Sequence, residues 1–526
     1  IAYDALREAG EDLDFDAFLT DLYDDGALDF FADAAAAAAI EAAVSERVAD
    51  LGRSLPDAVL ATHPAFEFTV LNVGGARSAV AAVDRFATLL ESARLAVGDR
   101  AALTFSAGNT LAAGVSLVAG LETQDPFFDA LAVDALAVDA FGLGAEDLEL
   151  GPQVYGIFLD RLEGAGVAVI TDVDPSREPN AFVPEALVAT TGALLIDRNA
   201  RRIGIVSATP EDLPRVTATR RLVTFTGDAR IARIQSGIDG VQRVGARIVV
   251  LLASERDLSA LGTLVGALRG VDLVVSLPGV PAVDTAFEGE GPRPIALVTL
   301  ADADGRDVPV VPGFGAYAGL VEADLRADPL GRLDPAATTA QSRRVAGADE
   351  ATPTAADADV ARDVTEPLAA AVETVREAPA GQNEVTLDPR PETLFSQAGN
   401  WGALVSDAVL FTARSQSRSF FTVPPVAALV DAGSMDSAAE LPPGSLTRGR
   451  LFDLVDDGQI VTVLEQVTAA DLERLLEFAF ANRGGGLFTQ VGGLFVEYDP
   501  EGTAQVLAAD GSVLVAGDRV VRARIG

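Results

Sequence analysis

Among the side chains that can bind a metal ion or take part in catalysis, carboxylates are the most numerous in this sequence. Glu146, Asp147 and Glu149 lie within four residues of one another, and Glu255 follows a run of apolar residues further along. Hard cations such as Ca²⁺ and Mg²⁺ bind oxygen ligands of this kind. These four residues could therefore form an all-carboxylate metal site. Acidic residues number 78 of 526, however, so acidic groups of this size also arise by chance.

The other residue types exclude several kinds of site. The chain has no cysteine and one histidine, His63, and all 39 of its cationic residues are arginine. Zinc sites built from cysteine, thiol nucleophiles and sites that need two imidazoles therefore cannot form within one chain. Schiff-base and P-loop lysines are excluded as well. We expect His63, which precedes Pro64, to be a loop residue.

The charge balance excludes two classes of partner. The formal net charge is −39, and a surface this negative repels nucleic acid and anionic lipid. No membrane span is expected, because the longest purely apolar run, Ala34–Ile40, is much shorter than the roughly 18–20 residues that a span needs. Hydrophobic residues make up 49% of the chain, which is enough for a sizeable core.

The elements that would position these carboxylates alternate between strands and helices. Helices are predicted over residues 81–95 and 228–244. Strands are predicted over residues 66–71, 102–106, 167–170, 202–206, 247–252 and 272–276. This order is typical of an α/β unit with a largely parallel sheet. Residues 302–307, between two apolar runs, are predicted to be a hairpin turn rather than a calcium loop.

The composition divides the chain into four segments. Residues 1–64 are predicted to be an acidic helical N-terminal segment. Its apolar residues, including Phe15, Phe18, Leu22, Phe30 and Phe31, predict a docking and assembly role. Residues 65–335 are the α/β unit, and residues 336–366 are predicted to be a linker. Residues 367–526 are predicted to form an α+β domain. Its helices are expected at 367–376, 401–414 and 469–481, and its strands at 383–387, 426–430 and 460–466.

Six segments, in the same order and spacing, carry a resemblance to a known family. They are Leu103–Gly114, Phe127–Leu136, Ile203–Pro210, Gly270–Val275, Asn400–Ala408 and Phe488–Gly493. Over about residues 65–526 the chain resembles the 5'-nucleotidase family, two-domain dinuclear metallophosphoesterases of the bacterial periplasm and cell surface. The resemblance implies a metallophosphoesterase-like α/β sandwich followed by a 5'-nucleotidase C-terminal-like α+β domain. It also implies a periplasmic, cell-surface or extracellular location.

The resemblance implies a centre in which Asp, His and Asn hold two metals and a bridging hydroxide attacks a phosphoryl group. The matching positions of this sequence have lost those ligands. They read Asn72-Val-Gly-Gly75, Asn109, Gly144-Ala-Glu-Asp147, Ser254 and Ser276-Leu-Pro-Gly-Val280, which includes Pro278. We therefore expect no catalytic residue, no metal and no cofactor.

The substrate contacts implied by the resemblance are altered as well. The family's Asn-Gly-Gly-Gly-Ile-Arg segment corresponds to Asp431-Ala-Gly-Ser-Met-Asp436, and the carboxylate of Asp436 would repel phosphate. One stacking aromatic is replaced at Asp456-Asp457. The other matches Phe488, which we interpret as a core or rim residue. The vestigial cleft positions are therefore predicted to be Asn109, Glu146, Ser254, Pro278, Asn400, Asp431, Asp436 and Phe488.

Three functional hypotheses remain at this stage. The first is a non-catalytic protein, not an enzyme, with a structural or interaction role at the cell surface or in an extracellular assembly, whose partners are proteins or copies of itself. The alternative is a nucleotide phosphohydrolase that holds Ca or Mg at Glu146, Asp147, Glu149 and Glu255. The third is a nucleotide sensor, which Asp436, the lack of lysine and the net charge disfavour. A small-molecule substrate is not expected under the first hypothesis.

Overall fold

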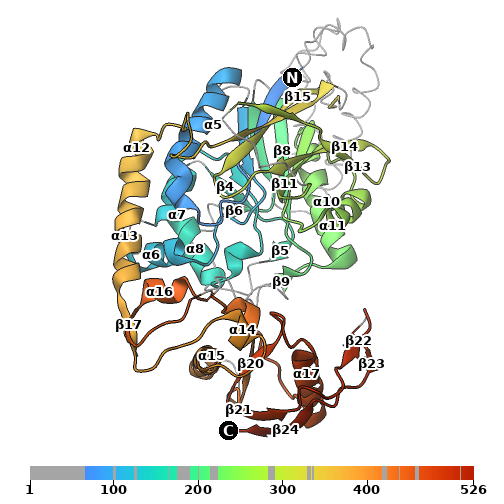
Figure 1. Cartoon of the computed structure of the whole chain (residues 1–526). Helices are drawn as coiled ribbons and strands as arrows, with labels where there is room; N and C mark the ends of the chain where they lie inside the picture. The colour runs from blue at the N-terminus through green and yellow to red at the C-terminus, as the bar shows by residue number, and fades with distance from the viewer. Residues whose placement is uncertain are drawn as a thin grey trace, which may run out of the picture.

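The computed structural model in Figure 1 describes most of the chain after residue 65. The described residues are 66–526 without 99–101, 124–126, 165, 175–189, 199–200, 214–222, 282–290, 328–332, 335–336, 418–422, 438, 456–460 and 510. The predictions for residues 1–64, for His63 and for Asp456-Asp457 lie outside this part. No helix within the described residues is long and apolar enough to cross a membrane.

Two stacked sheets form the centre of the first unit. The first sheet has the strand order β12-β16-β15-β1-β2-β3-β4-β6, and its strands from β1 to β6 run parallel. Strand β15 pairs antiparallel with β1, as does β16 with β15. The bounds are β1 (Phe66–Asn72), β2 (Ala102–Ser106), β3 (Ala140–Phe141), β4 (Val167–Val169), β6 (Thr190–Thr191), β12 (Arg293–Ile295), β15 (Gly319–Ala327) and β16 (Thr339–Arg344).

The second sheet has the order β13-β14-β11-β10-β8-β7, in which the four central strands are parallel. Its strands are β7 (Leu194–Arg198), β8 (Arg201–Ala208), β10 (Ile248–Ala253), β11 (Leu273–Pro278), β13 (Val298–Ala301) and β14 (Asp307–Gly313). Strands β13 and β14 pair antiparallel, and the backbone amides of Asp304 and Arg306 donate to the Asp302 carboxylate between them. The predicted hairpin turn at 302–307 is confirmed.

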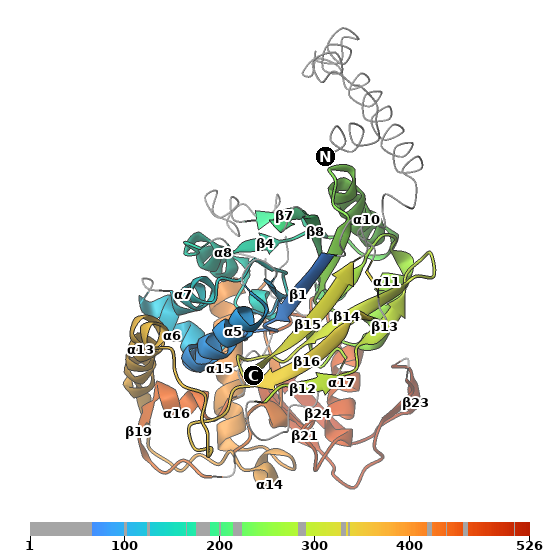
Figure 2. The same ribbon diagram turned by 90° about the horizontal axis from the view of Figure 1, so that it is seen from above.

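Helices cover the outer face of each sheet (Figure 2). The first sheet carries α5 (Val83–Val97), α6 (Val115–Thr123), α7 (Phe128–Ala135), α8 (Pro152–Asp160) and α13 (Glu366–Glu377). The second carries α10 (Gly227–Arg243) and α11 (Leu258–Ala267). Residues such as Val70, Phe105 and Val250 fill the space between the sheets. Strands that are buried on both faces need apolar residues at every position. The apolar runs predicted as strands therefore coincide with the central strands of the two sheets. The predicted α/β fold class is confirmed.

The expected linker at 336–366 is wrong. Residues 339–344 are strand β16 of the first sheet, and they are followed by α12 (Ala358–Val360), η6 (Ala361–Thr365) and α13. Val360, Val364 and Leu368 recur every four residues and are buried in the core of the first unit, together with Val375. Their spacing makes a helical apolar stripe. The helix expected at 367–376 therefore exists, but it packs on the first unit.

The C-terminal unit is built from short elements around two small cores. Its helices are α14 (Pro391–Leu394), α15 (Asn400–Ser417), α16 (Arg448–Phe452) and α17 (Ala469–Ala481). Its antiparallel strand pairs are β17 (Pro379–Asn383) with β19 (Gly444–Thr447), β18 (Ala428–Asp431) with β20 (Thr489–Gly492), β21 (Leu494–Tyr498) with β24 (Val520–Ile525), and β22 (Val506–Leu507) with β23 (Val513–Val515). Ion pairs join Arg448 to Glu122 and Arg376 to Asp453 at 2.6 and 2.8 Å.

Two strands predicted for the C-terminal unit are placed differently. The strand expected at 383–387 lies at 379–383, where the Asn383 amide donates to the carbonyls of Val385 and Pro442 and turns the chain. The described residues 461–466 form no strand, although their sequence alternates as a strand would, because no described strand pairs with them. The helices expected at 401–414 and 469–481 are confirmed, and the strand expected at 426–430 is found at Ala428–Asp431.

Candidate functional site

The carboxyl ends of the parallel strands bring together the predicted positions of the first unit. Asn72 ends β1, Asn109 follows β2, Glu146 lies in η2 (Glu146–Leu148) after β3, Ser254 follows β10 and Pro278 ends β11. Ligand sites of α/β proteins commonly lie at this edge, because strands of one direction all end there. We call this region, residues 72–78, 106–112, 142–149, 254–255 and 276–280 with the 313–317 loop, the carboxyl edge.

Asn72 joins the two sheets at the carboxyl edge. Its buried side-chain nitrogen donates to the carbonyl oxygens of Ser276 and Val311, each at 3.0 Å. Its oxygen accepts from the Gly74 amide at 2.9 Å. Both ends of the amide group are therefore engaged by the main chain.

Asn109 and Asp147 lock two neighbouring loops together. The Asp147 carboxylate accepts from the backbone amides of Asn109, Leu111 and Gly144 at 2.7–2.9 Å. The Asn109 side-chain oxygen accepts from the Glu146 amide at 3.2 Å. Burial raises the pKa of Asp147 to about 7, and the backbone hydrogen bonds oppose that shift.

Ser254 and Pro278 lie close to glycines of the neighbouring loops at the carboxyl edge. The Ser254 hydroxyl donates to the carbonyls of Ala107 and Leu143, the latter at 2.9 Å. A Cβ atom on Gly108 would lie 2.8 Å from the Ser254 oxygen, and one on Gly315 would lie 2.7 Å from the Pro278 ring. The loops therefore touch where they meet.

Arg77 and Arg230 hold two of the four acidic residues of the carboxylate hypothesis, Glu146 and Glu255. Arg77 pairs with Glu146 at 2.7 Å. Arg230 lies on α10 and pairs with Glu255 at 2.5 Å and with Asp172 at 3.0 Å, all three being buried. Burial raises the pKa of Glu146, Glu255 and Asp172, and the paired arginine opposes the shift in each case.

The sequence interpretation missed both arginines. Arg77 lies five residues from Asn72, but Arg230 is 25 residues from Glu255 and 58 from Asp172. No local pattern marks Arg230 as a partner. The structure does not bring the four carboxylates of that hypothesis into one cluster, and no group of three or more acidic or histidine side chains in the described residues is arranged to hold a metal ion.

Of the four predicted positions of the C-terminal unit, Asn400 and Phe488 play structural parts and the other two are exposed. Asn400 opens α15, accepting from the Asp388 amide and donating to the Thr386 carbonyl. Asp431 and Asp436 are exposed. Phe488 is buried and packs on Phe480, with ring centroids 5.5 Å apart. The interpretation of Phe488 as a core residue is confirmed.

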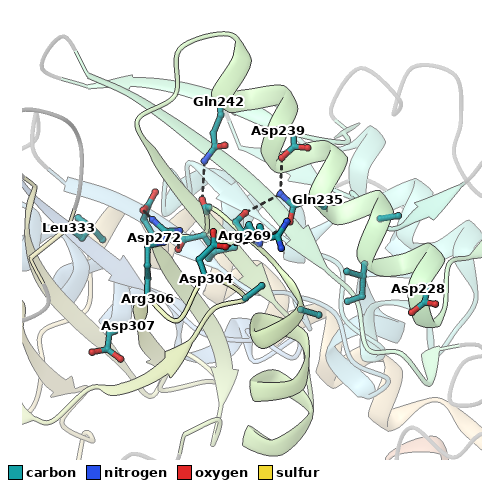
Figure 3. Close-up of a pocket in the computed structure, with 16 residues that line it drawn as sticks. Asp228, Gln235, Asp239, Gln242, Arg269, Asp272, Asp304, Arg306, Asp307 and Leu333 are labelled. Atoms are coloured by element: carbon teal, nitrogen blue, oxygen red, sulfur yellow. Dashed lines mark hydrogen bonds and ion pairs between the residues drawn. The ribbon is translucent and has the colours of Figure 1, made fainter. Parts of the chain in front are cut away.

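A groove of about 1140 Å³ lies at the opposite end of the parallel strands (Figure 3). It is bounded by α10, the loop before β11 and the 302–307 turn. Its charged residues largely pair with one another: Arg269 contacts Asp304 at 3.2 Å and Arg306 contacts Asp272 at 3.4 Å. None of the predicted site residues lines this groove.

Comparison with a protein-family model identifies the C-terminal unit. Residues 379–525 match the model described as the 5'-nucleotidase C-terminal domain. This unit is similar to that domain. The match begins just after α13 ends, so the matched segment starts after the last helix that packs on the first unit.

Solved structures extend the likeness to both units. The 5'-nucleotidase precursor from Thermus thermophilus is 18% identical, with 88% of this chain and 85% of that one covered and a TM-score of 0.53. NAD nucleotidase from Haemophilus influenzae is 14% identical, with 88% and 86% covered and a TM-score of 0.56. A putative 5'-nucleotidase from Staphylococcus aureus is 13% identical, with 87% of this chain and 86% of that one covered and a TM-score of 0.55. The chain therefore shares the two-unit 5'-nucleotidase fold. A search of curated protein sequences finds no match.

No histidine stands at the carboxyl edge, so its residues do not reproduce the dinuclear metal centre that the resemblance implies. The oxygens of Asn72 and Asn109 belong to neutral amides and each accept a backbone amide, and Ser254 presents a neutral hydroxyl that donates to carbonyls. These positions therefore supply no negative charge to balance two divalent cations. Asp147 accepts three amides, and Glu146 faces Arg77. The polar groups at this edge hold the loops to each other.

Restoring an acid at the first strand should therefore weaken the fold. In Asn72→Asp, a carboxylate would replace the amide that donates to Ser276 and Val311 and would face two carbonyl oxygens. We expect a loss of about 1–3 kcal/mol in the free energy of unfolding, the typical cost of buried groups left without a partner. Urea unfolding followed by circular dichroism, with and without Mn²⁺, measures this. Recovery of stability on adding Mn²⁺ would contradict the packing account of this edge.

Proposed function

We propose that this chain is a non-catalytic protein with a 5'-nucleotidase fold, and that it has a structural or interaction role outside the cytoplasm. Its partners would be other proteins or further copies of the chain. The observation that carries the proposal is the hydrogen bonding of Asn72 and Asn109. These two amides stand where the resemblance implies metal ligands, and each accepts a backbone amide at its side-chain oxygen.

The composition supports the proposal independently of any alignment. The only histidine is His63, so an imidazole-rich dinuclear centre cannot be assembled within one chain. In the C-terminal unit, Asp436 stands where the resemblance implies an arginine for the phosphate, and Phe488 is buried in a core instead of offering a face to a base.

The alternative function, a phosphohydrolase with a carboxylate-rich site, would require several contacts to break. Glu146 and Glu255 would have to leave their arginines, and Asp147 would have to release three backbone amides. Nothing in the described structure favours this rearrangement over the observed packing.

A hydrolysis assay tests the proposal. We expect the purified full chain to release no phosphate from AMP, a UDP-sugar or a chromogenic phosphodiester in the presence of Mn²⁺, Zn²⁺ or Ca²⁺. An active 5'-nucleotidase assayed in parallel provides the positive control. Turnover at or above about 1 s⁻¹, the ordinary range of enzymes, would overturn the proposal. The double variant Glu146→Gln/Asp147→Asn then separates a carboxylate site, whose activity it removes, from a contaminating enzyme.

A further inference from the structure

Five arginines lie together at the edge of the first unit where its parallel strands begin. They are Arg94 of α5, Arg198 of β7, Arg202 of β8, Arg243 at the end of α10 and Arg247, which precedes β10. We call these five residues the arginine surface. The proposed function uses none of them. In a chain whose formal net charge is −39, a concentration of positive charge marks a place that attracts anionic groups.

Thr104 and Asp139 connect Arg94 to Arg198. The Arg94 guanidinium donates to the Thr104 hydroxyl at 2.7 Å, and the Thr104 amide donates to the Asp139 carboxylate at 2.8 Å. Asp139 in turn pairs with Arg198 at 2.6 Å. Arg94 lies on a helix that covers the first sheet, whereas Arg198 belongs to the second sheet. The arginine surface therefore spans both sheets.

The other three arginines adjoin Val244. Arg202 donates to the Val244 carbonyl at 2.7 Å and pairs with Asp197 of β7 at 3.2 Å. The backbone amide of Arg247 donates to the Arg202 carbonyl at 3.1 Å, and Arg243 directly precedes Val244 in the sequence. These contacts make the five arginines one continuous surface.

Exposed apolar side chains adjoin the arginine surface. Leu95, next to Arg94, is 69% exposed, and Val244 is 51% exposed. Leu195 is 36% exposed and lies two residues before Asp197 on β7, so the two side chains share one face of that strand. Three of the six large apolar residues that are exposed in the described first unit therefore lie here. Apolar groups beside positive charges suit a partner that carries both apolar residues and acids.

The acidic N-terminal segment, residues 1–64, is attached to the described structure at this edge. Strand β1 begins at Phe66 and runs parallel to β2, so the preceding residues join the first unit on the side where the parallel strands begin. Phe66 belongs to the same core between the sheets as Ile248, which directly follows Arg247. A segment tethered here meets the arginine surface at a high effective concentration.

The composition of this segment complements the arginine surface. Residues 11–25 carry seven acids and no arginine, with Phe15, Phe18 and Leu22 at helical spacing. At about 0.15 M salt, exposed charges more than ~8 Å apart are largely screened, so a docking segment responds to the local arginines more than to the net charge of the chain. The arginine surface of a second copy is a poor occupant, because like charges would face each other.

We propose that residues 1–64 dock on the arginine surface of their own chain. The acids of residues 11–25 lie against the arginines, and the apolar residues of the segment lie against Leu95, Leu195 and Val244. The docked segment covers an edge that carries both positive charge and exposed apolar groups. This inference goes beyond the proposed function, since it does not depend on whether the chain hydrolyses a phosphate ester.

Distances between two spin labels in the full chain test the docking. The chain has no cysteine, so labels attach only at introduced sites. Thr20→Cys labels the segment, and Ala96→Cys labels an exposed position of α5 beside the arginine surface. In the control pair, Thr412→Cys on an exposed position of α15 takes the place of Ala96→Cys. With unlabelled chain in excess, we expect one narrow distance distribution for the first pair and a longer distance for the control pair.

Charge reversal tests the chemistry of the docking. In Arg243→Glu/Arg247→Glu the narrow distribution should broaden and the docked fraction should fall about tenfold, because like charges then face each other. Arg522→Glu/Arg524→Glu makes the same charge change on exposed residues of β24, and it should leave the distribution narrow. Circular dichroism checks that each variant keeps its fold.

A charge swap separates lost docking from lost folding. Adding Asp14→Arg/Asp21→Arg to Arg243→Glu/Arg247→Glu should restore the narrow distribution, because opposite charges face each other again. A folded surface is required for that recovery.

Three outcomes would overturn the proposal. The first is a broad distribution between Thr20→Cys and Ala96→Cys in the otherwise unchanged chain, a result that needs no charge variant. The second is a narrow distribution that persists in Arg243→Glu/Arg247→Glu. The third is a narrow distribution that disappears when unlabelled chain is in excess, which would place the segment on a neighbouring copy. None of these outcomes bears on phosphate release, so failure of the docking and failure of the proposed function are separate results.

Discussion

Replacing Arg230 with Met is expected to lower the free energy of unfolding of the first unit by about 3–5 kcal/mol, the range measured when one partner of a buried ion pair is removed. Arg230 is 4% exposed and lies between the carboxylates of Asp172 and Glu255. It also donates to the Thr209 carbonyl. Without the guanidinium, the buried carboxylates of Asp172 and Glu255 lose their common counter-ion.

The destabilisation of Arg230→Met should depend on pH. Burial already raises the pKa of Asp172 and of Glu255, and Arg230 opposes both shifts. Removing Arg230 raises both pKa values further, so the variant binds protons that the unfolded chain releases. Its stability should therefore fall more steeply than that of the wild type as pH rises from about 4 to 8. Urea unfolding at pH 5 and pH 8, followed by circular dichroism, measures the difference.

Arg202→Met provides the matched control. Arg202 pairs with Asp197 at 3.2 Å, but both side chains are largely exposed. Exposed pairs contribute about 0–1 kcal/mol, so this variant should stay close to the wild type at both pH values. Equal losses in the two variants would show that the buried position of Arg230 does not matter. The compensated variant Arg230→Met/Asp172→Asn/Glu255→Gln should recover part of the loss.

Replacing Trp401 with Ala is expected to destabilise the C-terminal unit by about 3–5 kcal/mol, the usual cost of deleting a large buried aromatic side chain. Trp401 is 1% exposed and packs with Leu394, Met435 and Leu441. Its indole nitrogen donates to the Met435 carbonyl at 2.9 Å. The variant therefore loses apolar contacts and leaves a buried carbonyl unpaired.

Calorimetry and hydrogen exchange can assign this effect to one unit. Peptides from α15 and β18 should lose protection in Trp401→Ala, while peptides from β1 and β10 should keep it. Phe411→Ala changes an aromatic residue on the same helix that is 74% exposed, and it should fall within about 0.5 kcal/mol of the wild type. Loss of protection throughout the first unit would indicate that the two units unfold as one.

The limits of the sequence interpretation are clearest at the connection between the two units. Residues 336–366 look like a linker because their apolar residues are few and isolated. Val360, Val364 and Leu368 share one face only when the segment is helical. That face stabilises the helix only because it packs against apolar residues of α5 and α6. Whether a segment with so weak an apolar stripe forms a packed helix therefore depends on the surface against which it lies.

The sequence alone determined the chemistry that one chain cannot perform, since one histidine and no cysteine or lysine exclude whole classes of site regardless of fold. It also determined most of the central strands and the longer helices, because fully buried strands and amphipathic helices need apolar residues at local, regular spacing.

Only the tertiary structure decided what the remaining polar residues do. Asn72 meets carbonyls 204 and 239 residues away, Arg230 joins acids from two strand ends, and Asp147 accepts the amide of Asn109, 38 residues away. Such contacts follow from which strands lie side by side and where they end. Local spacing carries no record of that arrangement, because each partner belongs to a different strand or helix.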